Sequence, residues 1–177
     1  LQEPDTTISV LKNFYDGAKR YASDNFMAYR AGLSTDPKKI IDDYKKITYQ
    51  QSFYYINLIA DLLKQNGIKA QDRVAIYAKN SPLWLFGDLA TMLNDTVSAP
   101  LYDTLSLEQI IYCLNLVGAK AIYCSQSYLP SIIASIDKVP SLKLVISFDK
   151  LDIDTIRTQT AYPYDGTIKL TVQTEEA

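Results

Sequence analysis

Residues 99–106 read APLYDTLS, and this stretch decides how the surrounding chain is expected to fold. The apolar residues from Val97 to Leu101 predict a short buried strand, which then opens into a polar loop. Ser106 and Gln109 have the spacing of a capping box, so a helix is expected to begin at Ser106. A strand that ends in a loop before a capped helix is where open α/β sheets bind ligands.

Short apolar runs alternate with helical patterns on both sides of this stretch. The expected strands besides the one at Val97 are 26–30, 44–48, 74–78, 121–124 and 142–148. The expected helices cover 6–22, 49–66, 82–93, 106–117 and 130–136. This alternation predicts an α/β fold with a doubly wound, mainly parallel sheet and helices on both faces.

Local signals predict where several of these helices begin and end. Residues suited to capping stand before them: Thr6 or Thr7, Thr48, Ser81, Ser106 and Ser127. Gly67 and Asp95 follow helices and are expected to take the left-handed conformation, which Asp adopts at some cost. The helix over 49–66 is expected to bury one stripe of residues, namely Phe53, Ile56, Ala60 and Leu63.

Three parts are expected along the chain. Residues 1–43 would form an N-terminal helix, a short strand and a surface loop. Residues 44–149 would form the α/β sheet, since the alternation of strands and helices is continuous there. Residues 150–177 are polar and ambiguous, and we expect a loosely structured tail with an edge strand at 167–172.

Composition excludes several classes of function. The chain of 177 residues contains no histidine, which removes Ser-His-Asp and Cys-His nucleophile pairs and His metal ligands. Its 18 basic and 20 acidic residues nearly balance, so no basic field suggests a nucleic-acid partner. Cys113 and Cys124 are expected to be buried free thiols of a reducing compartment rather than a disulfide or metal ligands.

No targeting or membrane-spanning segment is recognised in the sequence. No apolar run reaches the roughly 18–20 residues that a membrane span needs, and the N-terminus lacks the pattern of a signal peptide. We therefore expect an intracellular protein, in the cytoplasm or on the cytoplasmic face of an organelle membrane. Since the chain starts at Leu1 rather than Met, we expect a cut fragment or a processed product.

Three motifs carry a family resemblance. They are RVAIY at 73–77, NSPLW at 80–84 and PLYDTL at 100–105. Together they resemble the N-terminal part of long-chain fatty acyl-CoA synthetases, which are adenylate-forming, AMP-binding enzymes. The similarity runs from about Ile47 to Ile146 and corresponds to the first quarter to third of such an enzyme.

The resemblance implies a parent enzyme that activates a fatty acid with ATP and Mg²⁺ and transfers the acyl group to coenzyme A. Family members hold the triphosphate in a Ser/Thr/Gly-rich loop that ends in lysine, whereas the six glycines of this chain are scattered singly. The adenine-contacting motif, the ribose-binding aspartate and the catalytic lysine would all lie beyond Ala177. We therefore expect no catalytic residue, no metal ligand and no activity in this chain alone, and no tight binding of ATP, Mg²⁺ or coenzyme A to it.

The resemblance also implies roles for four residues. Tyr102, Asp103 and Thr104 correspond to a loop on the coenzyme A side of the site, and Trp84 would line the acyl side. Each has a structural alternative. Asp103 and Thr104 can hydrogen-bond the turn and the next helix start, and Trp84 can act as a packing anchor, because one large aromatic buries about 150–250 Å².

The expected partners follow from the same resemblance. They are a long-chain fatty acid, coenzyme A and the remainder of the same large domain, with a homo-oligomer contact and membrane attachment left open. A second hypothesis is a stand-alone, non-catalytic α/β module that descends from such enzymes and serves in binding or assembly. The length of the native reading frame distinguishes the two hypotheses.

Overall fold

The computed structural model describes residues 9–30, 44–148 and 167–168. The chain divides into two compact units, residues 1–58 and 59–177. The expected surface loop at 31–43 and most of the expected tail after 149 lie outside the described residues. The division of the chain at 43/44 and 149/150 stays a prediction.

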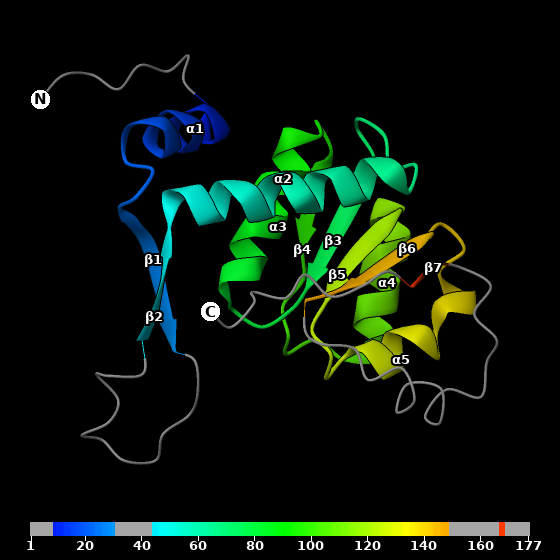
Figure 1. Ribbon diagram of the computed structural model, residues 1–177. Coiled ribbons are helices and arrows are strands. Elements are labelled where there is room, and N and C mark those ends of the chain that lie inside the picture. Colours follow the sequence, from blue (N-terminus) through cyan, green and yellow to red (C-terminus); the bar gives the residue numbers. More distant parts are fainter. Residues whose placement is uncertain (1–8, 31–43, 149–166, 169–177) are drawn as a thin grey trace, which may run out of the picture. The chain divides into compact units, whose positions relative to one another are not determined.

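The first unit contains a helix, a two-stranded sheet and the start of a second helix (Figure 1). Helix α1 (Val10–Arg20) is followed by β1 (Asn25–Arg30), β2 (Tyr44–Thr48) and α2 (Tyr49–Gln65). β1 and β2 pair antiparallel in a sheet of their own, so they are not strands of the parallel sheet. Ser9, rather than Thr6 or Thr7, caps the described helix, because its side chain accepts a hydrogen bond from the Lys12 N–H.

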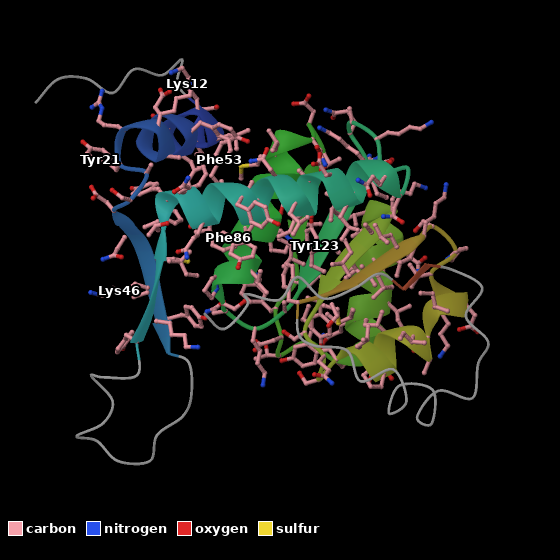
Figure 2. All side chains as sticks on the ribbon, viewed as in Figure 1. Lys12, Tyr21, Lys46, Phe53, Phe86 and Tyr123 are labelled. Atoms are coloured by element: carbon pink, nitrogen blue, oxygen red, sulfur yellow. The ribbon has the colours of Figure 1, made fainter. Side chains whose placement is uncertain are left out.

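Aromatic rings form the interior of the first unit. The Phe26 ring lies 5.1 Å from that of Phe14 and 4.8 Å from that of Tyr49, measured between centroids. Phe53, labelled in Figure 2, packs edge-on against Tyr15 with centroids 5.0 Å apart. Because this contact lies at the surface, Phe53 remains 37% exposed, which corrects the prediction that it is buried.

The second unit is built on a five-stranded sheet. Its strand order is β4-β3-β5-β6-β7, and every neighbouring pair is parallel. The strands are β3 (Arg73–Tyr77), β4 (Val97–Pro100), β5 (Ala121–Cys124), β6 (Leu144–Ser147) and β7 (Thr167–Ile168). β7 lies at one edge of this sheet and falls within the edge strand that was expected at 167–172. β4 lies at the other edge, with Val97 and Pro100 exposed and the two residues between them half-buried, which corrects the prediction of a buried strand.

Helices cover both faces of this sheet. The helices are α3 (Pro82–Leu93), α4 (Leu107–Val117), α5 (Leu129–Ile133) and a 3-10 turn at Ile136–Lys138. On one face the core joins α4 and α5 to Ala75, Ile122 and Val145 of the sheet. The fold is therefore the expected doubly wound α/β arrangement. Among the helices of the described residues, none combines the length and apolar character needed to cross a membrane.

The opposite face is packed around Tyr123 of β5, which is fully buried (Figure 2). Its ring stacks on Phe148 with centroids 5.0 Å apart, and its hydroxyl lies 3.4 Å from Thr91 Oγ1. Gly87 of α3 faces both rings. A Cβ at this position would lie 2.7 Å from Phe148 Cζ and 3.2 Å from the Tyr123 ring, so glycine permits the close approach of α3 to the sheet.

Side-chain caps confirm most of the expected helix starts. Ser106 and Gln109 form the complete capping box of α4, and Ser81 accepts from the Trp84 N–H at 3.3 Å. Thr48 and Gln51 make the same reciprocal pair of hydrogen bonds at the start of α2. The prediction for α5 was wrong. The helix is shorter than 130–136, and its N-cap position is held by Tyr128 without a side-chain hydrogen bond.

Left-handed residues mark the turns before β3 and β4. Gly67 and Asp95 take positive φ angles of 76° and 54°, as expected. Gln71, which carried no such signal, also takes a φ of 67°. Its N–H donates to the Asp95 carbonyl at 2.8 Å, so the two turns are tied together at the amino ends of neighbouring strands.

Replacing Gly87 by alanine should destabilise the protein. Overpacking a core costs about 1–3 kcal/mol, which exceeds the gain of about 1 kcal/mol that alanine brings to a helix interior. Urea denaturation followed by circular dichroism measures the difference.

Phe148→Leu in the Gly87→Ala background is the matched rescue. The smaller side chain removes the nearest clash, so the double variant should lose less stability than the sum of the two single variants. A Gly87→Ala variant more stable than the parent protein would contradict the packing described here.

Candidate functional site

A pocket of about 550 Å³ lies at the carboxyl ends of β3 and β4. Its lining combines the last residue of β4, residues that follow β3 and β4, and one residue of α3, namely Ala78, Asn80, Trp84, Pro100, Leu101, Tyr102 and Asp103. All of these residues belong to the second unit. The pocket therefore stands at the edge of a parallel sheet where α/β proteins bind ligands.

Parallel pairing places the 101–106 loop beside β3. The Leu101 N–H donates to the Ile76 carbonyl at 2.9 Å, which extends the pairing with β3 one residue beyond the end of β4. The loop then turns, and the Leu105 N–H donates to the Tyr102 carbonyl at 3.3 Å. Leu101 and Leu105 pack against the core of the α4–α5 face. These apolar anchors leave Tyr102 to project outward, with 80% of its surface exposed.

The start of α3 supplies the other wall. Asn80 follows β3, and the Ser81 cap fixes the first turn of the helix, which contains Trp84. Pro82 suits this turn because its fixed φ angle matches the helix and its missing N–H needs no partner. The indole of Trp84 is consequently held at the pocket while the helix continues into the core.

Three of the four residues predicted for the site meet at this pocket. Trp84, Tyr102 and Asp103 all line it, although the motifs that contain them are separated by a whole helix and strand. Thr104 is exposed and is not among the lining residues. The assignment of Tyr102–Thr104 to coenzyme A and of Trp84 to an acyl group stays a prediction.

Tyr128 is a neighbour of the site that the sequence did not single out. Its ring stacks on that of Tyr77, with centroids 4.4 Å apart and planes 27° from parallel. Burial raises the pKa of Tyr128, and the negative charge of Asp103 raises it further. Burial likewise raises the pKa of Tyr77, with Tyr128 as the next cause. Asp103 thus lies between the pocket and this tyrosine pair, an arrangement for which no local sequence signal exists.

The lining of the pocket suits a neutral group better than a phosphate. Asp103 is its one charged lining residue, and a carboxylate repels a phosphate. Asn80, Trp84 and Tyr102 add an amide, an indole N–H and a phenol, together with two aromatic surfaces. The residues that line the pocket therefore do not fit the triphosphate of ATP.

The described residues also offer no metal site. Neither Cys113 nor Cys124 forms a disulfide; Cys124 is buried and Cys113 is half-buried. Within residues 9–30, 44–148 and 167–168, no three His, Cys, Asp or Glu side chains gather closely enough to hold a metal ion.

Comparison with known proteins agrees with this architecture. The family model described as "AMP-binding enzyme" matches residues 27–174. Fatty acyl-CoA synthetase A of Dictyostelium discoideum is 30% identical over 153 residues, which cover 86% of this chain and 22% of that protein. Long-chain-fatty-acid–CoA ligase 5 of Rattus norvegicus is 34% identical over 119 residues, covering 64% and 17%. The chain thus spans about a fifth of the length of these relatives.

Solved structures share the fold at lower identity. The A-PCP didomain of carboxylic acid reductase from Segniliparus rugosus, in complex with AMP, matches with a TM-score of 0.74 and 16% identity. The match covers 88% of this chain and 24% of that chain. The adenylation domain of a carboxylate reductase from Mycobacterium chelonae gives a TM-score of 0.72 at 22% identity, covering 88% and 25%.

Asp103→Asn should lower the pKa of the Tyr128 hydroxyl. The carboxylate disfavours the tyrosinate, so its neutralisation allows Tyr128 to ionise at lower pH. NMR titration of protein labelled with ¹³C in the tyrosine rings measures the midpoint, and Tyr128→Phe identifies the signal.

Asp137→Asn is the matched control, because Asp137 lies in the 3-10 turn and is not among the causes of the Tyr128 shift. It should leave the midpoint unchanged. An unchanged midpoint in Asp103→Asn would show that the carboxylate does not act on Tyr128.

Proposed function

The chain belongs to the AMP-binding enzyme family, and we propose that it is the N-terminal part of a long-chain fatty acid–CoA ligase. In the parent reaction the fatty acid carboxylate attacks the α-phosphorus of ATP, forming an acyl-adenylate and releasing pyrophosphate. The coenzyme A thiol then attacks the acyl carbon, loses its proton and displaces AMP. The parent enzyme would require Mg²⁺ with the ATP.

The observation that carries this proposal is the joining of two family motifs at one pocket. Trp84 of the NSPLW motif and Tyr102 and Asp103 of the PLYDTL motif line the same cavity at the strand ends. Relatives at 30–34% identity to this chain are named as fatty acyl-CoA synthetases or long-chain fatty acid–CoA ligases. The proposal extends that named activity to the parent of this chain.

Within the parent enzyme, the described residues would build a wall of the site and perform no bond-making step. Tyr102, Asp103 and Thr104 would stand on the coenzyme A side, and Trp84 would stand on the acyl side. Because the lining carries a carboxylate and no cation, the pocket would accept a neutral part of coenzyme A rather than its phosphates.

The chain alone would be inactive. The Ser/Thr/Gly-rich phosphate loop and the catalytic lysine of the family are not found in its sequence. We further propose that the chain packs against the remainder of the large domain and that the parent is intracellular, in the cytoplasm or on the cytoplasmic face of an organelle membrane.

The decisive experiment expresses the complete native reading frame and measures acyl-CoA formation from a long-chain fatty acid, ATP and coenzyme A. The expected result is fatty-acid-dependent production of AMP and acyl-CoA, with no activity from the 177-residue chain assayed in parallel. A reading frame that stops near Ala177 would instead favour the non-catalytic module. Fatty-acid-dependent consumption of ATP by the 177-residue chain alone would contradict its proposed inactivity.

Tyr102→Ala in the complete enzyme should raise KM for coenzyme A about tenfold and leave KM for the fatty acid unchanged. An aromatic contact contributes roughly 0.5–1.5 kcal/mol beyond its buried area, and 1.4 kcal/mol is a factor of ten. Trp84→Ala should show the opposite selectivity, with a larger increase in KM for the fatty acid than in KM for coenzyme A.

Tyr112→Ala is the matched control for Tyr102→Ala. Tyr112 is 66% exposed on α4 and does not line the pocket, so its removal should alter neither KM. If Tyr102→Ala changes only the KM of the fatty acid, the loop belongs to the acyl side and the assignment is wrong.

A further inference from the structure

Ser125 lies where β5 ends, beside the carboxyl end of β3. Its side chain is buried, with 8% of the residue exposed. The Ser125 Oγ accepts a hydrogen bond from the Lys79 N–H at 3.0 Å, across 46 residues of sequence. The Ser125 N–H donates in turn to the Tyr77 carbonyl at 3.2 Å. Ser125, in the β5–α5 connection, is thus hydrogen-bonded both to Tyr77, the last residue of β3, and to Lys79, two residues beyond it.

The same connection makes a third link to β3. The Tyr128 N–H donates to the Ser125 carbonyl at 2.9 Å, and the Tyr128 ring stacks on that of Tyr77. A backbone bond, a side-chain bond and a ring stack therefore hold the β3 exit against the β5–α5 connection. The pocket itself touches neither Ser125 nor Tyr128.

These links occupy a place where ligands commonly bind in related architectures. The connection after β3 leads to β4, towards one edge of the sheet. The connection after β5 leads to β6, towards the other edge. Neighbouring strands whose connections leave in opposite directions usually leave a binding crevice at their carboxyl ends. Here Ser125 and Tyr128 connect the exits of β3 and β5, and the pocket lies at the exits of β3 and β4.

Lys79 connects the hydrogen bond of Ser125 to the pocket. Its neighbours Ala78 and Asn80 both line the cavity, and Trp84 follows in the first turn of α3. We propose that Ser125 is a positioning residue of the pocket, whose hydroxyl fixes the 78–80 segment and thereby the placement of Asn80 and Trp84. The effect on coenzyme A rests on the proposed function, whereas the placement of the segment does not.

The test compares Ser125→Ala with Ser125→Thr, which keeps the hydroxyl, and with Ser127→Ala. Ser127 is exposed in the same connection and is the matched control. Hydrogen exchange at the Lys79 amide reports on the bond itself. Trp84 is the one tryptophan in the sequence, so acrylamide quenching of its emission reports on the pocket. Coenzyme A titrated against the same emission reports on the ligand.

Ser125→Ala should speed exchange at the Lys79 amide by roughly three- to tenfold, as expected for one lost hydrogen bond. Trp84 should become more accessible to acrylamide, and coenzyme A should bind more weakly by a similar factor. Ser125→Thr should return all three measurements to the values of the unsubstituted chain, and Ser127→Ala should give those same values. The Ile146 amide in β6 should keep its exchange rate, which shows that the sheet remains folded.

Two outcomes would overturn the inference. One is an unchanged Trp84 response in a folded Ser125→Ala variant, which would make the bond merely structural. The other is faster exchange at Lys79 and Ile146 alike, which would show general destabilisation. If Ser125→Ala does not fold, Ser125→Cys replaces the hydroxyl with a weak acceptor of similar shape, and behaviour identical to the parent protein would again overturn the inference.

If coenzyme A does not bind to the unsubstituted chain, that result bears on the proposed function alone. In that case the exchange and quenching results still decide whether Ser125 positions the pocket.

Discussion

The architecture of the site depends on the pairing of strand β3 along both of its edges. The strand is buried from Val74 to Tyr77, so its backbone groups must be satisfied by neighbouring strands rather than by water. The carbonyls of its last two residues, Ile76 and Tyr77, accept from the N–H groups of Leu101 and Ser125. Because β4 and β5 both run parallel to β3, the loops that follow all three strands are brought to one edge.

Sequence reasoning succeeded where a structural cause acts over a few residues. The Ser106–Gln109 box spans three positions, and the Ser81 cap and the left-handed Gly67 are equally local. The family resemblance drew attention to Trp84, Tyr102 and Asp103, and the structure shows that all three line one pocket, because parallel strands share a carboxyl edge. Their roles stay predictions. Phe53 was misplaced, because helical periodicity cannot tell a surface aromatic contact from a buried one.

The remaining features depend on contacts between distant parts of the chain. Nothing around Ser125 indicates that its hydroxyl will meet the Lys79 N–H, since the two residues are 46 positions apart. The closeness of Gly87 to Phe148 is similarly invisible until the helix lies on the sheet. The lining of the pocket also became clear only in three dimensions, and among the described residues that line it Asp103 is the charged one.

The paired left-handed turns at Gln71 and Asp95 lie at the amino ends of β3 and β4, and the pocket lies at their carboxyl ends. L-amino acids carry a conformational cost in that region of backbone space, and glycine at either position would remove it. The residues that carry this cost lie at the opposite edge of the sheet from the pocket lining, so a substitution that relieves it changes none of the lining side chains.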